Sequence, residues 1–210
     1  MTVSALRAEE IFLRMSAEEL GDVAEGLWEK VVAACGMHYI PLHRIEDRGA
    51  PMQRGDDGLV LPDLDISAGR HNLYADSKGK RHPVLFRLAN EWRHGIEKHS
   101  WQFYDAISAR NRRHCCVAIF ECFRDEDNSG WSGALLINSL FQLGKPFAGH
   151  GTMASTVFWP RSRFVRAGAA SAAEALGLVP LGHYTTRPIR ECLRPLFDEL
   201  GGDPIQLRIE

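Results

Sequence analysis

Residues 61–80, LPDLDISAGRHNLYADSKGK, bring three aspartates and two lysines together around one turn. If two strands flank that turn, side chains two positions apart share a face, so Asp76 and Lys78 project to the same side. On the preceding strand, Asp63 and Asp65 also share a face. Hard divalent cations such as Mg²⁺ take oxygen ligands, which one or two aspartates supply. The stretch therefore predicts either a cation site or a charged hairpin on an ordinary surface.

The Asp-x-Lys tripeptide carries no weight on its own. With 27 acidic residues and five lysines in 210 positions, about 0.6 acid-x-Lys tripeptides are expected by chance, and the sequence contains one.

Other reactive patterns are incomplete. Cys35, His38 and His43 have no fourth zinc ligand beside them, and GKPFAGHGT, interpreted as a loop, does not have the residue order of a Walker A phosphate loop.

The elements that position this stretch follow from local patterns. Apolar residues at helical spacing, with Ser16 and Glu19 placed as a capping box, predict two helices before it. Gly69 suits a positive φ in the hairpin turn, Pro41 suits an edge strand, and Gly144 suits a helix end. Helices are expected over 4–14, 17–35, 96–111, 131–144, 169–177 and 187–202, and strands over 37–45, both arms of the hairpin, 114–123 and 155–160. A helix followed by a buried strand is typical of the crossover in an α/β sheet.

Composition indicates one cytoplasmic, soluble domain. The chain has 210 residues and five cysteines, an odd number without the spacing of a disulfide framework. We expect no secretory leader and no membrane span, because the longest apolar runs are far shorter than the roughly 18 residues that a bilayer requires.

Charge is uneven along the chain. Residues 1–65 carry 6 Lys and Arg against 13 Asp and Glu, whereas residues 66–114 carry 10 against 4. A basic segment directly after an acidic one could bind a polyanion while the neighbouring carboxylates bind cations. The same charge counts are also expected if these residues simply mix on a solvated surface after folding.

The order of these motifs resembles the core of the PD-(D/E)xK nuclease superfamily. That core has a helix with a glutamate, a strand, "PD" entering a second strand, "(D/E)xK" on a third strand, and then a helix and a buried strand. The matching residues are Glu25 in AEGLWEKVVAACG, Pro62 and Asp63 in LPDLDI, Asp76 and Lys78 in YADSK, and Gln102 in EKHSWQFYDAI. The resemblance covers about residues 17–123 and extends to small nucleases such as Holliday-junction resolvases. The chain departs from the pattern in two places. An aspartate replaces the commoner glutamate on the third strand, and Asp65 is an alternative to Asp63 as the second-strand carboxylate.

The resemblance implies an α/β fold of the restriction-endonuclease-like kind, a central mixed β-sheet flanked by helices. Residues 1–166 would form the nuclease core with its N-terminal helix, and residues 167–210 a C-terminal helical extension of the same domain. It implies a nuclease that hydrolyses DNA with Mg²⁺ or Mn²⁺. The implied metal ligands are Asp63, Asp76 and Glu25, with Asp65 as the alternative to Asp63.

The remaining implied roles concern the phosphate. Lys78 would orient the attacking water or offset charge on the phosphorane rather than act as general base, because two neighbouring carboxylates favour its protonated form. Gln102 would bind a phosphate or a metal-bound water. Contacts to the DNA backbone are expected from the basic residues Lys80, Arg81, Arg87, Arg93, Lys98, Arg110, Arg112 and Arg113.

Two other functional classes fit the same residues: an inactive nuclease-like module that binds DNA, and an α/β protein whose hairpin only mimics the motif. The preferred DNA structure and the oligomeric state, for which a homodimer is one option, stay open.

Overall fold

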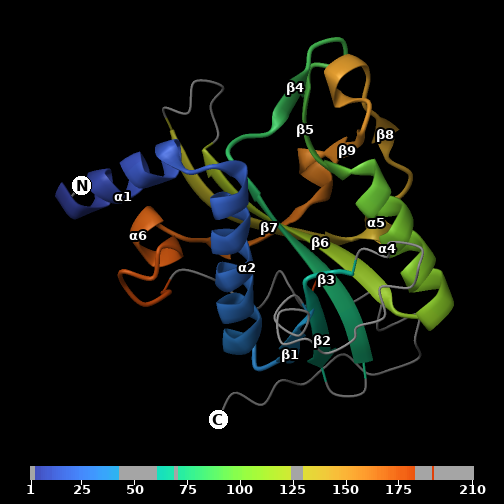
Figure 1. Ribbon diagram of the computed structural model, residues 1–210, viewed down its shortest axis with the longest axis horizontal. Helices are drawn as coiled ribbons and strands as arrows, with labels where there is room; N and C mark the ends of the chain where they lie inside the picture. The colour runs from blue at the N-terminus through green and yellow to red at the C-terminus, as the bar shows by residue number, and fades with distance from the viewer. Residues whose placement is uncertain (1–2, 43–60, 69–70, 124–129, 183–190, 192–210) are drawn as a thin grey trace.

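The structure is a computed structural model that describes residues 3–42, 61–68, 71–123, 130–182 and 191. It is a mixed α/β structure in which helices flank a central sheet (Figure 1). In chain order, its helices and strands are α1 (Val3–Arg14), α2 (Ala17–Ala34), β1 (His38–Pro41), β2 (Leu64–Ala68), β3 (His71–Lys80), β4 (Val84–Phe86), β5 (Glu91–Glu97), α4 (Lys98–Asn111), β6 (His114–Phe123), β7 (Trp131–Ser139), α5 (Leu140–Leu143), β8 (Phe147–Ala148), η1 (Gly151–Met153), β9 (Thr156–Pro160), η2 (Arg161–Arg163), β10 (Val165–Ala169) and α6 (Ala172–Ala175). None of the described helices is both long and apolar enough to cross a membrane.

The central sheet has six strands in the order β1-β2-β3-β6-β7-β10. β1, β2 and β3 form an antiparallel meander, and β6 joins it parallel to β3. The expected crossover is therefore confirmed, because the chain between β3 and β6 passes through α4. β1 lies at the edge of the described sheet. Pro41 has no backbone N–H to donate, and at an edge no second strand needs that hydrogen bond.

One face of the sheet is covered by α1, α2 and α6. The predicted capping box begins α2: Ser16 N donates to Glu19 Oε2 over 2.6 Å, and Glu19 N donates to Ser16 Oγ over 3.1 Å. Trp28 of α2 packs with Ala75 of β3 in the core on this side. α2 approaches β3 so closely that a Cβ on Gly79 would overlap the backbone of Leu20.

The opposite face is covered by α4, α5 and a second sheet of four strands in the order β4-β5-β9-β8, seen at the upper right of Figure 1. Tyr104 of α4 and Ile96 of β5 pack there against Val117 of β6. Alternate residues of β6 enter the two cores, so Cys116 faces α2 while Val117 faces α4. Burial on both faces explains why 114–123 is apolar except at His114 and Glu121.

The prediction of a helix over 131–144 is wrong for most of its length. Residues 131–139 form β7, and only 140–143 are helical, beginning after Ser139, whose Oγ accepts from Gln142 N, and ending at Gly144 with φ 66°. β7 is buried between two layers, so it has no alternation to distinguish it from a buried helix. The strands β4, β5, β8 and β10 were not predicted.

Several predicted features lie wholly or partly outside the described residues. They are the turn at Gly69, the end of the predicted strand 37–45, and the helix 187–202.

Candidate functional site

Asp76 lies at the centre of the site, fully buried in β3 on the face that α4 covers. Its Oδ1 accepts two hydrogen bonds, from Lys78 Nζ at 2.9 Å and from Tyr104 Oη at 2.6 Å. Its Oδ2 is also buried and has no hydrogen-bond partner among the described residues. Because buried polar atoms are nearly always paired, this oxygen marks a position for a group that the described residues do not supply.

Asp63 joins Asp76 from the neighbouring strand. It lies one residue before β2 begins, and its Oδ2 accepts from Ser77 N over 2.6 Å. Burial, and then the charge of Asp76, raises the pKa of Asp63 to about 7, although Lys78 and the Ser77 N–H oppose the shift. Burial also raises the pKa of Asp76 against the opposing effects of Lys78 and Tyr104. A half-buried and a fully buried carboxyl group therefore lie close together with incomplete compensation by positive charge.

Lys78 is the cation of this site. Burial alone would lower its pKa, but the carboxylates of Asp76 and then Asp63 outweigh burial and raise the pKa above that of an ordinary lysine. Lys78 is therefore an ammonium group beside these carboxylates, which donates a hydrogen bond to Asp76 and offsets negative charge. Its side chain is 24% exposed, so it also reaches the surface.

The other two predicted carboxylates lie in different places. Glu25 of α2 is half-buried, and its charge makes a small contribution to the raised pKa of Asp63, so it belongs to the electrostatic surroundings of Asp63. Asp65 is instead bound by Arg113, whose Nη1 lies 2.8 Å from Asp65 Oδ2. The structure therefore brings Asp63, Asp76 and Lys78 together with Glu25 nearby, and it pairs Asp65 with a different residue.

Gln102 lies on an exposed turn of α4 and lines an open cavity of about 540 Å³. The same cavity is lined by Glu97, a carboxylate that the sequence prediction missed. The charge of Glu97 affects the pKa of Asp76, Lys78 and Lys80, so it belongs to the electrostatic surroundings of the site. The sequence prediction placed Glu97 in the first turn of a helix over 96–111, where an acidic residue is common, because it did not predict β5.

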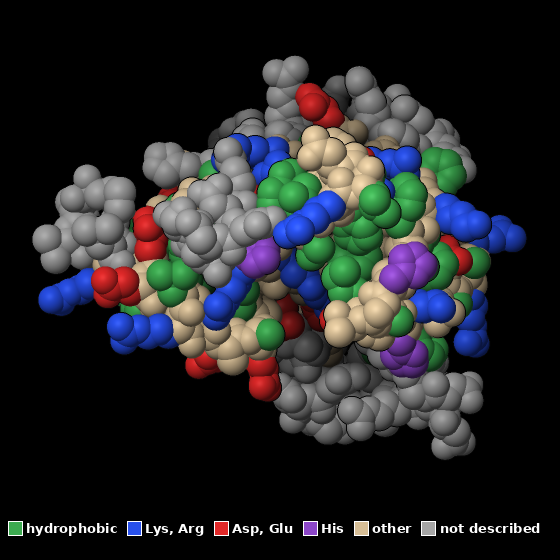
Figure 2. All heavy atoms as spheres, turned by 90° about the horizontal axis from the view of Figure 1, so that it is seen from above, with side chains coloured by type: hydrophobic (Ala, Val, Ile, Leu, Met, Phe, Trp, Pro, Cys, Tyr) green, Lys and Arg blue, Asp and Glu red, His purple; other side chains and the backbone are tan. Residues whose placement is uncertain are grey.

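Only part of the predicted basic set is available to a ligand. The exposed members are Arg87, Lys98, Arg110 and Arg112. Figure 2 shows Lys and Arg side chains spread over the face seen from above Figure 1, several of them around a central group of hydrophobic side chains. Lys80 is half-buried, and burial lowers its pKa.

The other members of that set are engaged within the protein. Arg93 is only 7% exposed, and its guanidinium lies 4.4 Å from the ring centre of Phe86 and 3.9 Å from that of Phe147. Arg81 donates to the backbone carbonyl of Met15. Together with the pairing of Arg113, these contacts stabilise the fold and leave those guanidinium groups less free to bind DNA.

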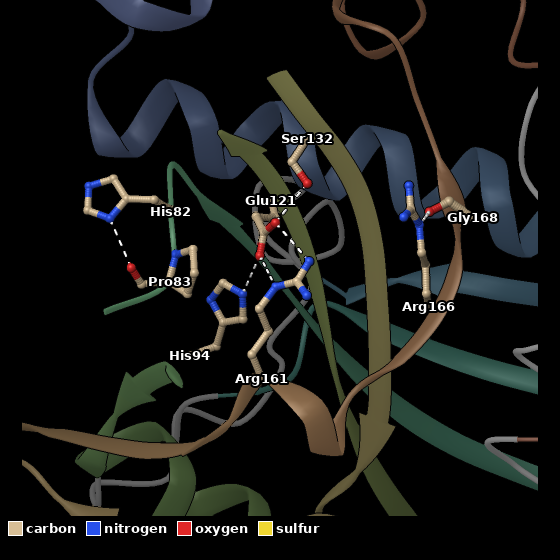
Figure 3. Close-up of polar contacts among 8 residues, drawn as sticks. All are labelled: His82, Pro83, His94, Glu121, Ser132, Arg161, Arg166 and Gly168. Atoms are coloured by element: carbon tan, nitrogen blue, oxygen red, sulfur yellow. Dashed lines mark hydrogen bonds and ion pairs between the residues drawn. The ribbon is translucent and has the colours of Figure 1, made fainter. Parts of the chain in front are cut away.

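A second buried polar network ties the two sheets together. The carboxylate of Glu121 in β6 accepts from His94 Nε2 at 2.8 Å, from Ser132 Oγ at 2.7 Å, and from Arg161 through Nε at 2.7 Å and Nη2 at 3.0 Å. Figure 3 shows these side chains pointing toward Glu121 from different elements. Burial alone would raise the pKa of Glu121, but the hydrogen bonds outweigh it and lower the pKa to about 2. The network fixes β5, and with it Glu97, relative to β6.

The donor set at Asp63 and Asp76 suits a hard cation. Among the described residues, no three His, Cys, Asp or Glu side chains form a group that could hold a metal ion, so a fully protein-ligated centre is not present in that part of the chain. Mg²⁺ usually takes one or two carboxylates and completes its shell with water and substrate phosphate. The unpaired Oδ2 of Asp76 beside Asp63 fits that smaller requirement.

No family model, no curated protein and no solved structure matches the chain. Nothing in these comparisons indicates the PD-(D/E)xK superfamily, so the resemblance of residues 17–123 stays a prediction from the sequence. The function is therefore inferred from the chain's own residues.

Proposed function

We propose that the protein is a metal-dependent nuclease that hydrolyses phosphodiester bonds of DNA at Asp63, Asp76 and Lys78. The observation that carries this proposal is the arrangement around Asp76. One of its oxygens is oriented by Lys78 and Tyr104, and the other is buried without a partner beside the second carboxylate. This leaves one carboxylate oxygen in a fixed orientation for a cation.

The order of the elements supports the proposal. Helix α2 with Glu25 precedes the meander β1-β2-β3, Asp63 stands at the start of β2, and Asp76 and Lys78 stand on β3. Helix α4 then leads to the buried strand β6, parallel to β3. The chain adds the hairpin β4–β5 between β3 and α4, and that hairpin supplies Glu97.

In this function Asp63 and Asp76 would bind Mg²⁺ or Mn²⁺, with Glu25 next to them. The cation would polarise the scissile phosphate and lower the pKa of a bound water. Lys78, as an ammonium group, would hydrogen-bond the phosphate and offset negative charge that develops on it. Tyr104, which is buried, would fix the orientation of Asp76 through its hydrogen bond.

The exposed cations supply affinity for the DNA backbone. Lys98 and Arg110 lie on α4, and Arg87 lies at the tip of the β4–β5 hairpin. Contacts of this kind are largely independent of base sequence and weaken as salt rises. Replacing one of these residues with alanine should reduce the slope of log K against log salt by about one.

The decisive experiment incubates purified protein with linear, branched and single-stranded DNA, with Mg²⁺, with Mn²⁺ or with EDTA. Wild type should cleave only with metal, and Asp76→Asn and Lys78→Ala should each lower the rate at least about 100-fold, equivalent to about 2.7 kcal/mol of transition-state stabilisation. Asp65→Asn is the matched control, since that carboxylate is paired with Arg113. It should cleave like wild type.

Circular dichroism must show that every variant is folded, because Asp76 is buried. Lys78 is partly exposed, so its alanine variant tests the site with less risk to the fold. The proposal is wrong if wild type cleaves none of the substrates with either metal, or if wild type, Asp76→Asn and Lys78→Ala cleave equally.

A DNA-binding module without activity is the second candidate. Two observations favour it: no three-residue metal group is found among the described residues, and Asp76 is already paired with Lys78. Such a module would bind DNA with strong salt dependence and cleave none, and removal of metal would leave its affinity unchanged.

A further inference from the structure

A second cavity, of about 460 Å³, opens where α4 ends and β6 begins. That volume falls within the range of small-molecule sites, roughly 300 to 1,000 Å³. Its apolar lining includes Ala109, Leu140 and Phe141. Phe141 is 61% exposed, which is unusual for an aromatic ring that already lines a hollow.

The rim of this cavity is mostly basic. It contains the consecutive residues Arg112, Arg113 and His114, together with one acid, Asp105. Arg113 is occupied by Asp65, but Arg112 is exposed and makes no ion pair with any described residue. Arg112 caps α4 in the left-handed region with φ 51°, which fixes its backbone at the cavity mouth.

An aromatic surface lies beside these cations. The ring of His114 meets that of Phe141 edge to face, with 6.0 Å between ring centres. An unpaired arginine beside an exposed aromatic ring and an apolar floor is complementary to a planar ring that carries an anionic group. A nucleotide has this chemistry, because a base stacks on an aromatic side chain while its phosphate binds a guanidinium group.

We propose that this cavity binds one nucleotide of the DNA strand, with the base against Phe141 and the phosphate at Arg112. The inference rests on the proposed nuclease function and extends it to a subsite for the strand. The cavity is adjacent to the carboxylates. Cys115, which lines it, pairs with Tyr74 in the β3/β6 ladder, two residues before the pairing of Asp76 with Val117. Two residues along a strand correspond to about 7 Å.

The test measures binding of deoxycytidine monophosphate by NMR in EDTA, so that no metal site contributes. Deoxycytidine, which has no phosphate, should bind at least about tenfold more weakly if Arg112 holds the phosphate. Phe141→Ala should weaken nucleotide binding by about 5- to 150-fold through lost stacking. Arg112→Asn, which tolerates the left-handed backbone, should weaken the nucleotide and leave the nucleoside unchanged.

Matched controls are Arg14→Asn, an exposed arginine in the last turn of α1 on the opposite face of the sheet, and Leu88→Ala, an exposed apolar residue elsewhere; both should bind like wild type. The inference fails if wild type binds no nucleotide into the millimolar range, or if Arg112→Asn and Phe141→Ala bind it as wild type does. Cleavage without nucleotide binding would refute the subsite alone. If the protein binds the nucleotide but cleaves no DNA with either metal, the proposed function is wrong, and the cavity is still a nucleotide site.

Discussion

Replacing Glu121 with glutamine removes the negative charge from the centre of the network that joins β5 to β6. Glu121 is fully buried, and its hydrogen bonds from His94, Arg161 and Ser132 lower its pKa from 4.5 to about 2. Because the folded pKa lies below the unfolded value, the stabilisation is complete above about pH 4.5 and is lost as the pH falls toward 2. At about 1.36 kcal/mol per pKa unit, the full contribution is about 3 kcal/mol, of which about 2 kcal/mol disappears between pH 7 and pH 3.

The assay is urea unfolding of wild type and Glu121→Gln at several pH values between those limits. At neutral pH the variant should be less stable by about 3 kcal/mol, because Arg161 loses its charged partner, and the difference should shrink to about 1 kcal/mol at pH 3. Burial lowers the pKa of His94 and its contact with Glu121 opposes that shift, so the substitution also changes the titration of His94. Repeating the comparison in a His94→Gln background separates the contribution of Glu121 from that of His94. Glu18→Gln, on an exposed part of α2, is the control and should change stability by less than about 0.5 kcal/mol. A difference between wild type and Glu121→Gln that does not vary with pH would refute the reasoning.

Two further perturbations test the elements that position the site. Tyr104→Phe removes the 2.6 Å hydrogen bond to the buried carboxylate of Asp76. In urea titrations the substitution should lower the free energy of unfolding by about 1.5 to 3 kcal/mol. An unchanged unfolding midpoint would show that the contact does not stabilise the fold. Gly79→Ala places a Cβ against the backbone of Leu20 and should cost about 1 to 3 kcal/mol, whereas Gly26→Ala in α2, with no atom within 4 Å of the added Cβ, should be neutral or stabilising by up to about 1 kcal/mol. Equal effects of the two glycine substitutions would contradict the close packing of α2 on β3.

The sequence predicted those parts of the site that depend on local rules. Alternation along a strand placed Asp76 and Lys78 on one face, and the structure pairs them at 2.9 Å. The capping box at Ser16 and Glu19 fixed where α2 begins, and therefore where Glu25 lies along the helix. These features need only a few neighbouring residues, so they can be read without the fold.

The sequence failed where the outcome depends on distant segments. Alternation placed Asp63 and Asp65 on one face, opposite the core residues Leu64 and Ile66, but it could not show that Arg113, just after the end of α4, pairs with Asp65. Arg93 looked like a DNA contact and is instead enclosed by Phe86 and Phe147. Only tertiary packing distinguishes these uses of the same residue types.

The unpaired Oδ2 of Asp76 allows a cation site to be separated from a purely structural ion pair. If Asp63 and Asp76 bind Mg²⁺, the folded state gains RT ln(1 + [Mg²⁺]/Kd), which is about 1.4 kcal/mol when the concentration is ten times Kd. The midpoint of thermal unfolding should therefore rise with Mg²⁺ in wild type and in Asp65→Asn. Asp76→Asn should not respond, because its side chain no longer offers a second carboxylate oxygen.

This measurement needs no DNA and no cleavage, so it is independent of the activity assay. If Mg²⁺ and Mn²⁺ leave the wild-type midpoint unchanged, Asp76 serves only to anchor Lys78 and Tyr104. If Asp76→Asn responds as strongly as wild type, the cation binds elsewhere. If the midpoint rises in wild type but not in Asp76→Asn, the buried oxygen is a ligand position. An ion pair that was complete within the chain would gain nothing from the metal.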